Sequence, residues 1–376
     1  MKQHLSRRAA LACGVVAFLL ASPAAQSAET VKIGIGLSLT GPLAFLSQQM
    51  LQGMKAAVQQ INASGAAGNG RTIELVVRDH KGVPSEALAV TKRLIEEDKV
   101  AIVDIDLPST VAIAVEAVTK DAKVPQIAGY TFAPAAVKQG NPYFFRASTN
   151  ASLIADALAR SIVEDKNNKT IAMLAPNDDY GRSAIQSLSA ALEAIGGPKV
   201  VLAEYYERTQ NDFSAVLLKM KSLNPDSLYI DVRWPASLTV IKQMVEVGLK
   251  KPLFSSLNFY NPKLAEQAGP LLEGTQLYVA WAPVFTDPAS VEFSKAYEEM
   301  FKQPPDDSAS LGWTVVMVAA QAIKAAGSAD GEALRKALTE INYNGPQGLV
   351  KFDSNGDANV AAHVLRFKDG GYHLVR

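Results

Sequence analysis

The chain has 376 residues, of which 48% are hydrophobic, and its 37 basic and 37 acidic side chains give a formal net charge of zero. This length exceeds what one ordinary hydrophobic core needs, so two domains are expected. The balanced charge leaves no basic stripe of the kind that nucleic-acid binders carry, and we expect no nucleic-acid partner.

The first 28 residues have the pattern of a secretory signal peptide. A basic start (Met1–Arg8) precedes an apolar run (Ala9–Leu20) and a stretch rich in Ala and Ser (Ala21–Ala28). This order predicts a cleaved export signal over residues 1–28, with cleavage between Ala24 and Ala28. No later apolar run looks long enough to span a bilayer, so we expect a soluble, exported protein.

Two alternatives concern the route of export and lipidation. Ser6–Arg8 leaves the twin-arginine route open, but the two alanines that follow favour general secretion. Cys13 ends a short lipoprotein-like box that lacks a preceding apolar run, which argues against lipidation. Because Cys13 is the single cysteine and leaves with the signal, the mature protein is expected to have no disulfide and no thiol chemistry.

Strands and helices alternate along the chain up to about residue 148. Short apolar runs predict buried strands, and periodic runs with capping residues predict helices. The expected strands are 31–37, 72–78, 100–105 and 125–128, and the expected helices are 45–63, 84–98 and 109–122. The segment 141–148 is expected to leave this series as an extended connection.

The alternation restarts after residue 148. Expected helices cover 151–164, 183–195, 212–223, 237–247, 288–301, 308–325 and 331–339. Expected strands cover 170–174, 200–206, 227–231, 253–255 and 275–280, and 350–352, 360–367 and 372–375 are expected to form an antiparallel tail. Two successive β-α-β series predict an α/β protein with two doubly wound parallel sheets.

Polar and aromatic residues follow two neighbouring strands of the first predicted sheet. Asp106 ends one strand, and Ser109 can cap the helix that follows it. Tyr130, Thr131 and Phe132 follow the next strand. Ligands of open parallel sheets bind beyond the carboxyl ends of the strands, and a helix N-terminus suits an anion. These residues therefore predict a cradle for a small organic anion.

Catalytic and cofactor signatures are missing from the sequence. Gly34 and Gly36 have the spacing of the first two glycines of a dinucleotide fingerprint, but Leu39 stands where the fingerprint needs its third glycine. The histidines of the mature chain are too scattered for a triad or a metal cluster, and 353–357 lacks the final glutamate of a calcium loop. We therefore expect a binding protein without cofactor or metal, not an enzyme.

Six segments, in order and at the right spacing, resemble one known family. They are KIGIGLSLTGP (32–42), AVQQINASG (57–65), VRDHKGVPSEALAVTKRLI (77–95), FFRAS (144–148), NDDYGRS (177–183) and DFSAVLLKMK (212–221). The chain resembles the leucine/isoleucine/valine-type periplasmic binding proteins of ABC importers, and the resemblance covers essentially all of residues 29–376. It implies a class I fold of two lobes with the ligand between them.

The resemblance also implies how the chain divides. Three crossing segments are expected near 146–149, 280–283 and 348–352. Lobe one would then hold residues 29–148 plus 282–350, and lobe two would hold 149–281 plus 351–376. The implied partners are a small-molecule ligand and an inner-membrane ABC permease, and the implied state is a periplasmic monomer.

Site residues can be carried over from the family position by position. Ser109 matches the hydroxyl that holds the ligand carboxylate in the first lobe. Tyr130 and Phe132 replace a small alanine and a threonine, with Thr131 between them. Tyr180 matches the tyrosine that closes over the ligand from the second lobe.

Two further positions depart from the family pattern. Arg233, beside Trp234, replaces a second closing tyrosine, and Leu257 replaces the glutamate that grips an amino-acid ammonium. Phe45 and Trp281 are additional candidate contacts.

These departures favour an aromatic carboxylate, such as a benzoate or a phenylpropenoate, as the ligand. A guanidinium grips a carboxylate through two parallel hydrogen bonds and stacks on rings. A buried ammonium without a partner would be costly. A branched-chain or other amino acid is the alternative, because Asp106 and Asp231 at strand ends can still pair with an ammonium. An exported α/β hydrolase and a sensor domain are the less favoured classes.

Overall fold

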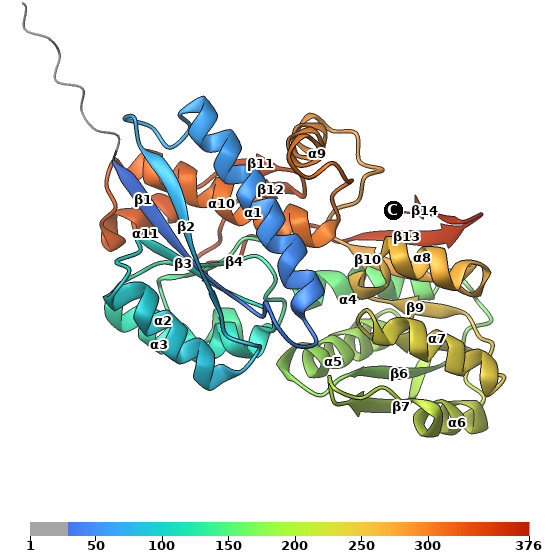
Figure 1. Cartoon of the computed structure of the whole chain (residues 1–376). Coiled ribbons are helices and arrows are strands. Elements are labelled where there is room, and N and C mark those ends of the chain that lie inside the picture. The colour runs from blue at the N-terminus through green and yellow to red at the C-terminus, as the bar shows by residue number, and fades with distance from the viewer. Residues whose placement is uncertain (1–28, 376) are drawn as a thin grey trace, which may run out of the picture.

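Two separate sheets, one parallel and one mainly parallel, organise the computed structural model, which describes residues 29–375 (Figure 1). The predicted signal peptide, Cys13 included, lies outside the described residues. The two-sheet α/β architecture predicted from the sequence is present.

The first sheet has the strand order β2-β1-β3-β4-β5, and all its pairs are parallel. Its strands are β1 (Thr30–Leu37), β2 (Thr72–Asp79), β3 (Ile102–Ile105), β4 (Gln126–Ala128) and β5 (Phe144–Arg146). All four residues of β3 are buried. A strand covered on both faces gives a continuous apolar run in the sequence, and this run predicted the strand.

Helices cover both faces of this sheet. Side chains of α2, α3 and β3 form one apolar cluster, whereas α1 packs with the buried side chains of β1 on the opposite face. The helices that pack with this sheet or with one another around it are α1 (Ala44–Ser64), α2 (Pro84–Glu96), α3 (Ser109–Ala122), α9 (Pro288–Phe301), α10 (Asp307–Ala326) and α11 (Gly331–Thr339). Helices from the last quarter of the chain thus complete the first lobe (Figure 1).

Helix α10 packs closely along α1. A Cβ added at Gly312 would lie 2.1 Å from the carbonyl oxygen of Met50, so only glycine permits this approach. By length and composition α10 could cross a membrane, although the sequence was expected to hold no such segment after residue 28. Most of it is buried inside the protein, as the core helix of a water-soluble protein would be.

The second sheet has the order β14-β13-β10-β9-β8-β6-β7. Its strands are β6 (Thr170–Pro176), β7 (Lys199–Tyr206), β8 (Ser227–Ile230), β9 (Leu253–Ser255), β10 (Gln276–Val279), β13 (His363–Lys368) and β14 (Gly371–Leu374). The first five are parallel, and β13 and β14 add an antiparallel edge as predicted. The expected tail strand 350–352 is wrong: β12 (Gly348–Val350) instead pairs with β11 (Tyr343–Gly345) in a separate hairpin.

Five helices flank the second sheet: α4 (Ala151–Ile162), α5 (Asp179–Ala194), α6 (Ser214–Leu223), α7 (Ala236–Glu246) and α8 (Pro262–Ala268). Short 3-10 turns lie at Ala136–Lys138 (η1), Leu257–Phe259 (η2) and Gly269–Leu272 (η3). Helix α5 begins four residues before the predicted start. The Asp178 carboxylate accepts a hydrogen bond from the Gly181 amide at 2.9 Å and so caps the helix early.

The segments that connect the two sheets are tied together by a buried ion pair. Arg146, at the end of β5, pairs with Asp357, which precedes β13. A Cβ at Gly356 would lie 2.2 Å from the carbonyl oxygen of Phe144, so glycine allows the two segments to touch. Asp307, at the start of α10, accepts hydrogen bonds from the Ala280 and Trp281 amides at 2.8 and 2.6 Å. The expected lobe boundaries stay a prediction.

Arg146→Ala is expected to destabilise the protein by about 3–5 kcal/mol, because it leaves the buried Asp357 carboxylate without its cation. Urea denaturation would measure the loss. Arg93→Ala is the matched control, since the Arg93–Glu97 pair is exposed and such pairs contribute about 0.2–1 kcal/mol. Equal losses for both variants would contradict a structural role for the buried pair.

Asp307→Asn is expected to change how stability depends on pH. Burial raises the pKa of Asp307 to about 7, so the folded state holds its proton and the stability this provides is lost as pH rises toward about 7. Asparagine keeps the acceptor oxygen and stays neutral. The variant should therefore match the wild type at about pH 4 and exceed its stability at about pH 8, by an amount on the order of 3 kcal/mol. Denaturation at both pH values tests this, and a constant difference would contradict it.

Candidate ligand-binding site between the two lobes

Asp106 fixes the loop that follows β4. Its buried carboxylate accepts hydrogen bonds from the amide of Tyr130, the hydroxyl of Thr131 at 2.6 Å and the amide of Leu107 at 3.0 Å. Burial raises the pKa of Asp106 to about 6, and these hydrogen bonds oppose the rise. The carboxylate is therefore ionised at neutral pH, and both it and the Thr131 hydroxyl are occupied within the protein.

Ser109 lies at the start of α3, but it does not cap the helix as predicted. The N-cap position is Pro108, which makes no side-chain capping bond, and Ser109 is the first helical residue. The buried Ser109 hydroxyl instead accepts a hydrogen bond from the Ala133 amide at 3.4 Å. It therefore joins the helix start to the aromatic loop.

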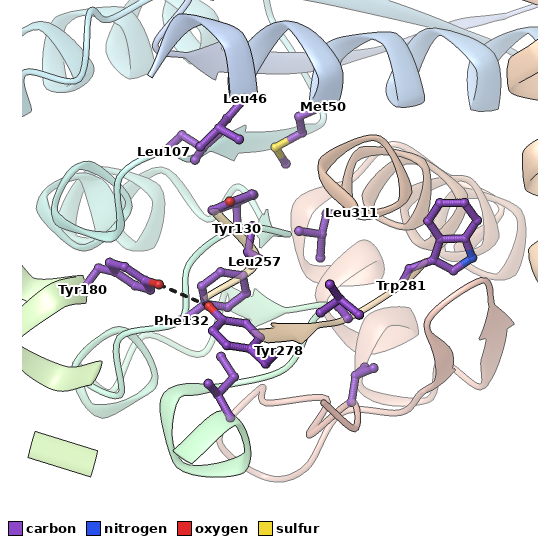
Figure 2. Close-up of a cluster of buried hydrophobic side chains, with 14 of the residues drawn as sticks. Leu46, Met50, Leu107, Tyr130, Phe132, Tyr180, Leu257, Tyr278, Trp281 and Leu311 are labelled. Atoms are coloured by element: carbon purple, nitrogen blue, oxygen red, sulfur yellow. Dashed lines mark hydrogen bonds between the residues drawn. The ribbon is translucent and has the colours of Figure 1, made fainter. Parts of the chain in front are cut away.

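Aromatic rings from both lobes meet in one buried cluster (Figure 2). The Tyr130 and Phe132 rings lie 5.1 Å apart, and Phe132 approaches Tyr180 at 6.1 Å and Tyr278 at 6.4 Å. Leu257 is buried in the same apolar core cluster as these rings. The Tyr130 hydroxyl is buried without a hydrogen-bond partner, so it is a donor that an incoming ligand could satisfy.

Asp231, at the end of β8, is fully surrounded by donors. Its carboxylate accepts hydrogen bonds from the side chains of Tyr180 (2.7 Å), Tyr229 (3.3 Å), Ser256 (2.7 Å) and Asn258 (2.6 Å). Burial raises the pKa of Asp231, and the bonds from Ser256, Tyr180 and Asn258 oppose the rise. Two donors at each oxygen leave little room for a ligand ammonium.

Arg233, two residues further on, has the opposite character. Its side chain is 7% exposed, and its Nε and Nη1 atoms are buried without hydrogen-bond partners. The guanidinium lies 4.9 Å above the Tyr180 ring, which is a cation–π contact. Its charge also opposes the burial-driven rise in the pKa of Tyr130 and of Tyr206, and its side chain forms a hydrogen bond with Tyr206 that lowers the pKa of that tyrosine further.

A pocket of 440 Å³ opens beside Arg233. Loop residues of both lobes line it: Gly41, Pro42 and Leu43 from the first, and Tyr206, Arg208, Thr209, Asn211, Arg233, Trp234, Pro235 and Ala236 from the second. Its volume falls in the range of about 300–1,000 Å³ that is usual for small-molecule sites. Ser109 does not line this pocket, so Arg233 and Ser109 are not brought to one cavity wall.

Two helices begin at this pocket, one from each lobe. Helix α1 starts after Leu43 and helix α7 after Pro235, and neither has a capping side chain or an acidic residue in its first turn. A helix start carries partial positive charge and free N–H groups. Because Arg233 also lines the pocket, the pocket is a favourable place for an anion.

Two expected contacts lie elsewhere. Trp281 is fully buried, donates a hydrogen bond from Nε1 to Ser290 at 3.1 Å and packs edge-on against Phe293. Figure 2 places it beyond Leu311, away from the Tyr130–Tyr180 cluster. Phe45 is half-buried near the start of α1 and does not line the pocket. The geometry thus favours a core role for Trp281, and its ligand contact stays a prediction.

The end of β7 and the loop after it were not expected to take part in the site, yet they supply Tyr206, Arg208, Thr209 and Asn211 to the pocket. A signal was present, because β7 is a parallel strand whose carboxyl end points to the same edge of the sheet as that of β8. Among residues 29–375, no three His, Cys, Asp or Glu side chains gather in a group that could hold a metal ion.

Comparison with known proteins places this geometry in a family. A family model described as periplasmic binding protein matches residues 30–371. A Leu/Ile/Val-binding protein homologue from Brucella suis is 26% identical over 351 residues, which are 92% of this chain and 93% of the relative. The chain therefore belongs to the periplasmic binding protein family, as the resemblance in the sequence indicated.

Solved structures of similar fold bind two kinds of ligand. A branched-chain amino acid binding protein from Streptococcus pneumoniae, in complex with isoleucine, matches with a TM-score of 0.83 and 24% identity, covering 92% of this chain and 99% of that one. A solute-binding protein of an ABC transporter from R. palustris, in complex with benzoate, matches with a TM-score of 0.83 and 22% identity, covering 92% and 95%.

Family membership gives the class of function. The chain is a solute-binding receptor of an ABC importer and not an enzyme. Its family works in the periplasm, together with a permease, on small-molecule ligands.

Proposed function

We propose that this receptor captures a small aromatic carboxylate, such as a benzoate or a phenylpropenoate, between its lobes and delivers it to an inner-membrane ABC permease. Arg233 is the observation that carries the proposal. A buried guanidinium with two unpartnered nitrogens, beside a pocket and above an aromatic ring, is suited to a planar carboxylate. The starts of α1 and α7 at the pocket also favour a negatively charged ligand, because they carry partial positive charge.

The acidic side chains argue against an α-amino acid. Asp106 and Asp231, which the sequence left open as ammonium partners, already accept hydrogen bonds from three and four protein groups respectively. Leu257 is apolar, and no carboxylate is among the described residues that line the pocket. An ammonium buried there would lack a partner, which is costly.

The aromatic residues supply the second part of the recognition. Arg233 lies over the Tyr180 ring, which adjoins Phe132 and through it Tyr130. These three rings do not line the pocket, whereas Trp234 and Tyr206 do. An aromatic ligand can pack against such rings in offset or edge-on arrangements. The unpartnered Tyr130 hydroxyl offers a hydrogen bond to a ring substituent or a carboxylate.

Similar folds bind isoleucine in one protein and benzoate in another, so the choice of ligand rests on this chain's own side chains. An amino acid is the second candidate because the curated relatives include Leu/Ile/Val-binding protein homologues. The lobes proposed to close on the ligand are residues 29–148 plus 282–350 and residues 149–281 plus 351–376. The receptor is proposed to act as a periplasmic monomer.

Benzoate or cinnamate derivatives are expected to bind more tightly than leucine or valine, because Arg233 finds its acceptor and no ammonium is left unpaired. A thermal-shift screen would identify binders, since a ligand at about 100 times its dissociation constant adds about 2.7 kcal/mol of stability. Calorimetry would then rank them. Submicromolar binding of leucine together with undetectable binding of every aromatic acid would reverse the proposal.

Arg233→Ala is expected to weaken binding of the best aromatic acid by about 2–5 kcal/mol, the cost of removing one partner of a buried charged pair. That corresponds to about 30-fold to several thousand-fold in affinity. Arg233→Lys should not restore binding, because an ammonium lacks the planar fork. Ser109→Ala should cost less, since this hydroxyl does not line the pocket.

Calorimetry on the three variants decides this, with circular dichroism and unliganded melting temperatures as controls for folding. If Arg233→Ala binds the ligand within about threefold of the wild type, which is under about 0.7 kcal/mol, then Arg233 has a structural role. A loss for Ser109→Ala that exceeds the loss for Arg233→Ala would instead place the carboxylate at the start of α3.

A further inference from the structure

A second arginine lines the same pocket as Arg233. Arg208 follows β7 and forms an ion pair with Asp178, the residue that caps α5. Its side chain is 18% exposed and that of Asp178 14%. The Arg208 Nη1 atom is buried without a hydrogen-bond partner. No motif in the sequence pointed to this residue.

Asp178 does not exhaust the capacity of Arg208. The Asp178 carboxylate also accepts a hydrogen bond from the Gly181 amide at the start of α5, where the helix dipole favours negative charge. A guanidinium has five N–H donors, so one carboxylate leaves several of them available. Asp178 itself is not among the residues that line the pocket. The pocket wall therefore contains two guanidinium groups and, among the described residues, no acid.

Thr209 and Asn211 add polar side chains to the wall near Arg208 in the chain. Rings are grouped at the other arginine, where Tyr180 lies under Arg233 and Trp234 adjoins it. A ligand with one acidic group at an aromatic end would pair with Arg233 and leave Arg208 without an acceptor from the ligand. Buried donors without acceptors are costly. A ligand with two acidic groups would give each of the two arginines an acceptor.

We infer that the preferred ligand has two acidic groups, one held by Arg233 and a second by Arg208, so that aromatic dicarboxylates are a better substrate class than aromatic monocarboxylates. This inference rests on the proposed function, because it uses the same pocket and the same role of Arg233. It makes Arg208 a specificity-determining residue.

The test compares benzoate with the ortho, meta and para isomers of benzenedicarboxylate by calorimetry on the full mature chain. At least one isomer should bind roughly tenfold more tightly than benzoate, which corresponds to one added charged contact. The double variant Arg208→Gln/Asp178→Asn removes both charges of the pair, and asparagine remains a good helix cap. In this double variant the dicarboxylate and benzoate should bind about equally, with affinities that differ by no more than about threefold.

Two further variants guard against trivial explanations. Arg208→Lys keeps the charge and the partner Asp178 but loses the planar fork, so the ratio of dicarboxylate to benzoate affinity should fall in this variant too. This variant provides the test in case the double variant does not fold. Arg182→Gln removes a nearby positive charge that stacks on Tyr205 and does not line the pocket. That variant should keep the wild-type ratio.

The outcomes separate the inference from the proposed function. Binding of no aromatic acid at all would overturn the proposed function. Binding of benzoate as tight as that of every dicarboxylate would overturn the inference alone. An equal loss of both ligands in the double variant, with the ratio unchanged, would also overturn it, because both arginines would then hold a single acidic group.

Discussion

The buried pair of Arg146 and Asp357 is the contact on which the arrangement of the two sheets depends. Arg146 ends the last strand of the first sheet, and Asp357 lies in the segment that leads back into the second. The same guanidinium donates hydrogen bonds to the carbonyl oxygens of Thr131 and Ala133 at 3.4 and 3.0 Å. One side chain therefore joins two connecting segments to the loop that supplies Tyr130 and Phe132.

The buried acids of the site are held by the protein itself. Asp106 orders the loop after β4, and Asp231 orders Tyr180 and the turn that contains Asn258. Such carboxylates act as anchors: each collects neutral donors from several elements and so fixes aromatic side chains that would otherwise change rotamer. A fully hydrogen-bonded network of this kind rigidifies its surroundings. Its cost is that neither acid remains available to a cationic ligand group.

The cations of the site are in the reverse situation. Arg233 has a ring beneath it but lacks acceptors for two nitrogens, and Arg208 has one carboxylate for five N–H groups. Because the acids are satisfied and the cations are not, the pocket favours a negatively charged ligand. A similar fold occurs in one protein that binds isoleucine and in another that binds benzoate. In this chain, the acids at the strand ends are satisfied by the protein and the cations are not.

The sequence alone determined the two β-α series, the long helices such as α10, and the family. Buried parallel strands and capped helices leave local patterns in the sequence that need no tertiary information. It also located Asp106, Tyr130–Phe132, Tyr180 and Arg233 at strand ends. Only the tertiary structure decided which of these groups are occupied, that Ser109 and Arg233 do not share the pocket, and that Arg208 does. The reason is that hydrogen-bond saturation depends on residues such as Ser256, Asn258 and Asp178, which lie far from their partners in the chain or gain their neighbours only when the strands are assembled side by side.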